Sequence, residues 1–139
     1  MQPVAVEFDP AANRILIGCR GDKPAFIVVD PSSGKVVATL PIGRGVDGMA
    51  HDEANHLFVT ANGVDATMSV IRQDGPDSYK LVETIATRPM ARVIAMEAGS
   101  KRLFTVTANY SQPAAGSDGK LPPPVFHRDS FTIMSYARE

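Results

Sequence analysis

Short runs of alternating apolar and polar residues recur along the whole chain. The runs are five to seven residues long, are rich in valine, isoleucine, phenylalanine and threonine, and are bounded by glycine, proline, asparagine or aspartate. This combination is typical of β-strands joined by turns. No stretch keeps a helical period between capping residues. The pattern therefore predicts an all-β chain.

The runs are organised as a threefold repeat. In each copy an acidic residue precedes a small polar turn and an apolar strand, and the copies span Phe8–Ile17, His51–Val59 and Met96–Val106. This alignment makes Ile15, Leu57 and Leu103 equivalent, at spacings of 42 and 46 residues. A period of about 40–45 residues is typical of four-stranded β-propeller blades. The repeat therefore predicts a β-propeller rather than a simple sandwich.

We predict about three blades in one half-propeller domain over residues 1–139, at about 3–43, 44–88 and 89–139. The predicted strands are Val4–Phe8, Arg14–Gly18, Ala25–Asp30, Val36–Leu40, Gly48–Asp52, His56–Ala61, Met68–Arg72, Lys80–Ile85, Arg92–Met96, Arg102–Thr107 and Ser130–Tyr136. The third blade has only three of them. Its outermost strand is expected to be missing.

A long loop separates the last two predicted strands. Residues 110–128 include Pro113, two glycines and the run Pro122–Pro124. Proline has no N–H group for a strand ladder, so we predict an irregular segment. Loops of this length are functional or mobile. An arm that binds a partner or closes the ring, and a decoration without a function, are both consistent with this composition.

Three blades leave both ends of the stack uncovered. Each blade buries its faces only against its neighbours, and propellers close with about four to eight blades. Two chains related by a two-fold axis give six blades and bury the ends in two equivalent interfaces. We therefore predict a homodimer that forms a six-bladed ring. A nine-bladed trimer and a fragment of a longer protein are the alternatives.

The end of the first blade carries a distinctive unit. Phe26–Gly43 holds a strand, an Asp-Pro-Ser-Ser-Gly-Lys turn, a second strand and a Pro-Ile-Gly exit. The entries to the next two blades are Gly45–Gly48 and Thr87–Arg92, and the C-terminal part contains Pro122–Pro124 and Asp129–Met134. On these residues, essentially the whole chain resembles the C-terminal half of YVTN-type β-propeller repeat proteins. The resemblance implies a propeller whose last outer strand usually comes from the N-terminal segment of a longer chain.

The resemblance also implies export, since such proteins usually carry a signal. The segment Met1–Val4 has no basic region followed by an apolar stretch, so a cytoplasmic location is the default expectation. No apolar run approaches the roughly 20 residues of a membrane span. The formal net charge is −1, from 14 basic and 15 acidic residues, and gives no field for non-specific nucleic-acid binding. We expect neither a membrane nor a nucleic acid as partner.

Composition disfavours the cofactors found in some propellers. The chain has no tryptophan on which a quinone would stack, three histidines where a multi-copper site needs many, and no Cys-x-x-Cys-His haem motif. The single cysteine, Cys19, is expected to be semi-buried in a strand. His51 and His56 are five residues apart, whereas the helical zinc motif needs four. We predict no cofactor and no metal ligands, and a divalent cation in the channel is the one ion left to consider.

Charged residues gather before the predicted innermost strands. Asp47 and Arg92 stand at matching points of two repeats, and Arg44, His51 and Arg88 lie nearby in the sequence. Innermost strands of a propeller line its channel, so these five are our candidate ligand-binding residues at the channel mouth. Salt bridges at the junctions between blades are the alternative explanation.

Two functional classes fit the sequence. The first is a non-enzymatic scaffold or binding module for a protein or small ligand. We prefer it because of the repeat itself and, as weaker support, because no catalytic motif such as Gly-x-Ser-x-Gly is present. The second is a metal-dependent, lactonase-like hydrolase, which needs several acidic residues around a cation in the channel. Asp47 is the one acidic residue that we expect there. The fold alone does not decide between the two.

Overall fold

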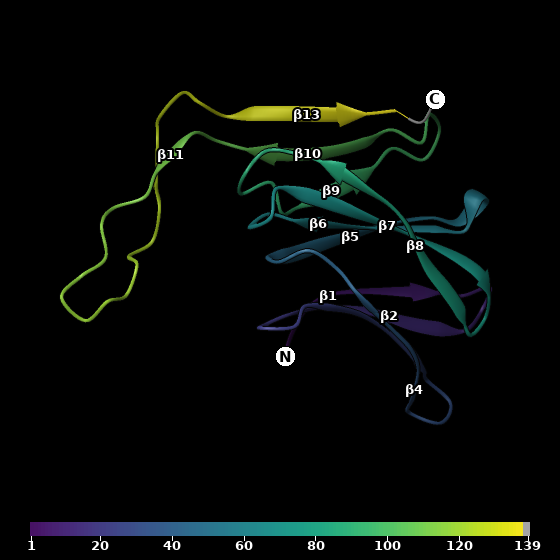
Figure 1. Ribbon diagram of the computed structural model, residues 1–139. Coiled ribbons are helices and arrows are strands. Elements are labelled where there is room, and N and C mark those ends of the chain that lie inside the picture. Colours follow the sequence, from purple (N-terminus) through teal and green to yellow (C-terminus); the bar gives the residue numbers. More distant parts are fainter. Residues whose placement is uncertain (138–139) are drawn as a thin grey trace.

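The computed structural model describes residues 1–137 of the chain. The strands form two four-stranded antiparallel sheets, one three-stranded sheet and a small hairpin (Figure 1). The first sheet holds β1 (Gln2–Asp9), β2 (Arg14–Arg20), β3 (Ala25–Asp30) and β4 (Lys35–Pro41); the second holds β5 (Val46–Asp52), β6 (Leu57–Asn62), β7 (Thr67–Gly75) and β8 (Ser78–Ala86); the third holds β9 (Ile94–Met96), β10 (Leu103–Thr107) and β13 (Thr132–Tyr136). The hairpin is β11 (Tyr110–Ser111) with β12 (Val125–Phe126), and a 3₁₀ turn, η1, spans Glu53–Asn55.

All the predicted strands are present, and the all-β prediction is confirmed. The third sheet has the order β13-β10-β9, and within residues 1–137 no fourth strand pairs with β13. The segment 110–128 is less irregular than predicted. Its two ends run antiparallel, and Tyr110 pairs with Phe126 with their ring centroids 6.0 Å apart.

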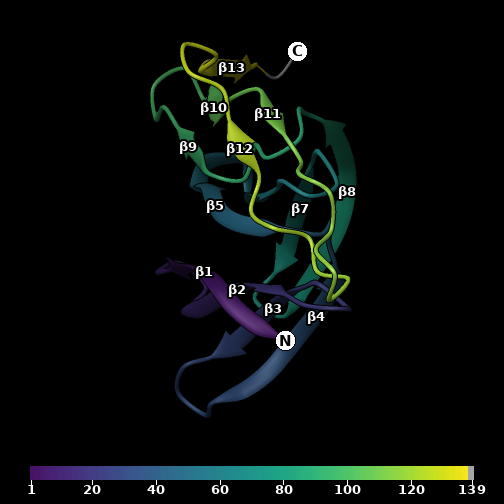
Figure 2. The same ribbon diagram turned by 90° about the vertical axis from the view of Figure 1, so that its left-hand side faces the viewer.

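The three sheets are stacked in the order of the sequence. β1 lies beside β5 and β5 lies beside β9, while β4 contacts β8. In Figure 2, β1, β5 and β9 lie on one side of the stack, and β4 and β8 lie on the other. Each sheet thus presents one face to its neighbour in the sequence. Within residues 1–137, no sheet covers the other face of the first sheet or of the third.

A four-residue turn joins the first two strands of each sheet. The residue before it is acidic and its last residue has positive φ: the pairs are Asp9 with Asn13 (φ 53°), Asp52 with His56 (φ 53°) and Glu97 with Lys101 (φ 58°). The carboxylates of Asp9 and Glu97 accept hydrogen bonds from backbone N–H groups of their own turns. The three turns share this geometry, and their common length of four residues sets the register of each sheet. Positive φ is costly for residues other than glycine and needs local support.

The register corrects the sequence alignment by one residue. In the second sheet Asp52 pairs with Leu57, so Leu57 occupies the place that Arg14 has opposite Asp9 in the first sheet. The position equivalent to Ile15 and Leu103 is therefore Phe58, and the spacings are 43 and 45 residues. The prediction for Leu57 is wrong because two adjacent large apolar residues give the same pattern, and only the length of the turn distinguishes them.

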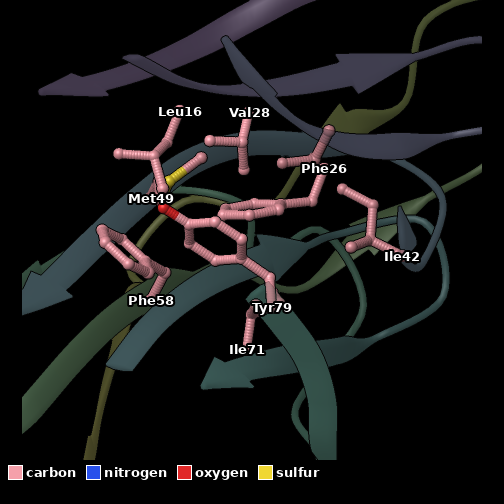
Figure 3. Close-up of a cluster of buried hydrophobic side chains, with 9 residues drawn as sticks. Leu16, Phe26, Val28, Ile42, Met49, Phe58, Ile71 and Tyr79 are labelled. Carbon is pink, nitrogen blue, oxygen red and sulfur yellow. The ribbon is translucent and has the colours of Figure 1, made fainter. Parts of the chain in front are cut away.

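The larger apolar core lies between the first and second sheets. The rings of Phe26, Phe58 and Tyr79 meet there with centroids 5.9–6.3 Å apart (Figure 3). The remaining buried members are Leu16, Val28, Ile42, Val46, Met49 and Ile71. Complete burial of one such side chain stabilises the fold by about 1.5–3 kcal/mol. A smaller core of Val59, Met68 and Val70 joins the second sheet to the third.

Glu97 gives the fold a predicted response to acid. Hydrogen bonds from Ser100 and Gly99 lower the pKa of its exposed carboxyl from 4.5 to about 2. A lowered pKa means that the carboxylate supports the turn above pH 4.5, and that this support is lost as the pH falls from 4.5 through about 2. We expect a carbon-13 NMR titration of the Glu97 carboxyl to have its midpoint near pH 2. A midpoint near 4.5 would show that the turn is not held in this way.

Candidate functional site

The first sheet has an apolar face on the side turned away from the second sheet. Residues opposite one another in a ladder share a face, and those on this face are Val6, Ile17, Ile27, Phe8, Ile15 and Val29. None of the six is fully buried. Val6 is 69% exposed and Phe8 is 52% exposed. The alternate residues Leu16, Phe26 and Val28 are buried against the second sheet.

The third sheet has a second apolar face, on the opposite end of the stack. Burial alternates along β13, with Thr132, Met134 and Tyr136 half-buried and the intervening residues exposed. Ile133 is 61% exposed, and it pairs with Val106 of β10 on the outward face. Phe104 of β10 belongs to the same face, and Phe131, 67% exposed, directly precedes β13.

In the second sheet, the faces equivalent to these two are both covered by neighbouring sheets. It packs Met49, Phe58 and Ile71 against the first sheet, and Val59, Met68 and Val70 against the third. The free face of the first sheet is equivalent to the former face, and that of the third sheet to the latter. Exposed contiguous apolar surfaces of this kind mark interaction sites. We refer to them below as the first and third end faces.

Asp47 links all three sheets through arginine side chains. Its Oδ1 accepts a hydrogen bond from Nη2 of Arg20, at the end of β2, and its Oδ2 lies 3.3 Å from Nε of Arg92, just before β9. From their matching places in two repeats, the sequence predicted Asp47 and Arg92 as members of a ligand site at the channel mouth or, alternatively, of salt bridges at a junction between blades. It gave no sign of Arg20, which is 27 residues earlier and reaches Asp47 only because the sheets stack. The cluster is a junction between sheets.

The other three candidate residues have different partners. Nε of Arg44 is 2.7 Å from Oδ1 of Asp65, the ring of His51 stacks on Phe58 at 4.1 Å, and Arg88 donates to Asn109 Oδ1 at 2.8 Å and to Thr132 Oγ1 at 3.2 Å. In residues 1–137, none of the three has a hydrogen bond or ion pair with Asp47. The five predicted residues are thus divided among four separate sets of contacts.

The described residues contain no group of three or more His, Cys, Asp or Glu arranged to hold a metal ion. Asp47 is engaged by two arginines, which compete with a cation for its oxygens. Cys19 lies in β2 and is more deeply buried than the semi-buried position that the sequence predicted, and burial raises the pKa of its thiol. A raised pKa opposes formation of the nucleophilic thiolate. No described helix has the length and apolar character needed to cross a membrane.

A shallow hollow of about 370 Å³ lies at the base of the β11–β12 hairpin. Arg88 and His127 are among its lining residues, and Ser111 Oγ is 2.7 Å from His127 Nε2. Both members of this pair are exposed. The pair has no signal in the sequence, because its two residues are separated by the proline-rich segment and only the hairpin brings them together.

No protein-family description and no curated protein matches the sequence. Among solved structures, the hydrazine synthase of Kuenenia stuttgartiensis matches 91% of this chain with a TM-score of 0.65 and 12% identity. A nidogen/laminin complex matches 96% with a TM-score of 0.61 and 11% identity, and a protein of unknown function from Bacteroides caccae matches 91% with a TM-score of 0.52 and 10% identity.

This chain spans 36%, 50% and 47% of the lengths of those three chains, respectively. At 10–12% identity the similarity concerns the fold alone. It agrees with several four-stranded antiparallel sheets packed in sequence order. The chain has a propeller-like, all-β repeat fold.

Proposed function

We propose that this chain is a non-enzymatic β-propeller scaffold that closes a six-bladed ring with a second copy and presents its loops to a protein or small ligand. The observation that carries the proposal is the pair of apolar end faces at opposite ends of the stack. A blade of a propeller covers each face with a neighbour. Here Val6, Phe8 and Ile133 are left more than half exposed.

The two end faces have complementary positions in the repeat. The first end face is equivalent to the face that the second sheet turns to the first, and the third end face is equivalent to the face that the second sheet turns to the third. The first end face of one chain can therefore pack on the third end face of another, in the same relation as successive sheets within a chain. A two-fold axis repeats this contact and closes the ring.

A closed ring suits a binding scaffold. Ring closure removes the two exposed faces and leaves the strand-connecting loops as the variable surface, where ligand contacts are usually made on rigid folds. No observation in the described residues favours the hydrolase alternative, since the one predicted channel carboxylate, Asp47, serves a salt-bridged junction.

We expect the wild-type protein to have about twice the chain mass of 14.8 kDa in light scattering. Phe8→Asp and Ile133→Asp each place a charge in both equivalent interfaces, so each variant alone should be monomeric. A mixture of the two variants should regain dimers, because one interface then joins two unaltered faces. Val64→Asp, at a loop position that is 60% exposed, is the control and should remain dimeric.

Other outcomes of this experiment contradict the proposed ring. A wild-type monomer at high concentration, or a trimer, excludes a six-bladed dimer. Loss of dimers with Phe8→Asp but not with Ile133→Asp indicates that two first end faces pack on each other. Thermal unfolding of each variant, measured in parallel, separates loss of assembly from loss of the fold.

A further inference from the structure

An open cleft of about 570 Å³ lies between the second and third sheets, on the side of their outer strands. Its floor and walls are mainly apolar and include Val59, Val70, Ile85, Leu103 and Tyr136. These residues come from β6, β7, β8, β10 and β13. The cleft continues the small core that joins the two sheets, since Val59 and Val70 belong to both.

The equivalent place between the first and second sheets is filled by a strand. There β8, the fourth strand of its sheet, contacts β4 and inserts Tyr79 between the two sheets. The ring of Tyr79 lies 6.0 Å from that of Phe26 and 6.3 Å from that of Phe58, and its residue is only 8% exposed. The third sheet has no such strand in its described part, and the cleft opens at that point.

The third sheet also has a free edge beside the cleft. β13 corresponds to β7, because Leu103 pairs with Tyr136 as Phe58 pairs with Ile71. β7 pairs with β6 on one side and β8 on the other, whereas β13 pairs only with β10 among the residues that the structure describes. Figure 1 shows β13 as the outermost strand of its sheet. An unpaired strand edge is a template for another strand.

We propose that this cleft binds an extended segment of a separate polypeptide, which pairs antiparallel with β13 as the missing fourth strand. Its alternate side chains point into the cleft, so the segment carries an aromatic residue and an apolar residue two positions apart, as Tyr79 and Leu81 stand in β8. Charges on the cleft wall are balanced, with Asp52 and Glu83 against Arg72 and Lys101. A segment with little net charge therefore matches it.

The cleft lies within one chain and does not use either end face. The proposal therefore stands whether or not two copies close a ring. Backbone hydrogen bonds to β13 supply affinity that does not depend on sequence, and the apolar cleft supplies the preference for particular side chains.

The chain itself provides a probe for this site. We expect a capped peptide with the sequence of Ser78–Ala86 to bind the full-length protein saturably and to slow hydrogen exchange of the β13 amides. A peptide in which the residues copied from Tyr79 and Leu81 are both alanine should bind at least tenfold more weakly. Val82→Lys, which places a charge at a 44% exposed cleft residue, should weaken binding of the original peptide to a similar extent.

The matched control is Val64→Lys, an exposed valine outside the cleft, which should bind the peptide as the wild type does. The proposal is overturned if no peptide binds at millimolar concentration, if Val82→Lys binds normally, or if the protected amides lie outside β13. It is also overturned if β13 is protected in the protein alone and the peptide lowers the oligomeric mass, since a second copy then occupies the cleft. Light scattering without peptide reports ring closure separately.

Discussion

Replacing Phe58 with alanine is expected to destabilise the protein by about 3–5 kcal/mol. The ring is fully buried and contacts both Phe26 and Tyr79, and His51 stacks on it at 4.1 Å. Its removal leaves a cavity at the centre of the contact between the first two sheets. The surrounding rings belong to strands fixed by their ladders, so they cannot collapse into the space, and the lost contacts are not replaced.

Urea unfolding followed by far-ultraviolet circular dichroism measures this loss. The comparison needs one fixed protein concentration, because association would add to the apparent stability. Phe126→Ala is the matched control: its ring is 47% exposed on the β11–β12 hairpin, and we expect a change below about 1 kcal/mol. Equal losses for the two variants would mean that the packing of Phe58 does not hold the first two sheets together.

The strands were predictable because their determinants are local. Alternation, turn residues and the threefold spacing are all present within about 45 residues of one another. The equivalence of Phe58 was not predictable from this pattern, since Leu57 and Phe58 satisfy it equally well. The register is fixed by the turn that ends at His56, which has positive φ. A histidine in a sequence does not indicate this backbone conformation.

The candidate site was less predictable, because it depends on how sheets stack. Asp47 and Arg92 were found from their matching places in two repeats, but Arg20 belongs to another repeat and to the far end of a strand. The first end face did have a signal in the sequence. Ile15, Leu16 and Ile17 are consecutive apolar residues, and a strand with apolar residues on both faces is expected to be covered on both. No comparable pattern in the sequence identifies the ligand or the partner.

Replacing Gly45 with alanine is expected to destabilise the protein by several kcal/mol, on the order of 3 or more. Gly45 has φ +81°, and an added Cβ would lie 2.6 Å from the backbone N of Val64 and 2.5 Å from its Cγ2. The loop before β5 and the loop after β6 would have to separate. That movement would strain the hydrogen bonds from Gly63 N–H to the Gly45 carbonyl and from Val64 N–H to the Arg44 carbonyl.

Gly34→Ala separates the cost of the left-handed backbone conformation from the cost of the close contact with Val64. Gly34 also has positive φ, at +69°, but an added Cβ there meets no atom within 4 Å. Its replacement should therefore cost only the backbone strain, about 1 kcal/mol. If urea unfolding gives equal losses for the two variants, the close approach of the two loops is absent and only the left-handed conformation matters. A larger loss for Gly45→Ala that is not restored by adding Val64→Ala assigns the excess to the N and Cβ atoms of residue 64, because the second substitution removes only the contact with Cγ2 and leaves those at 2.6 and 2.9 Å.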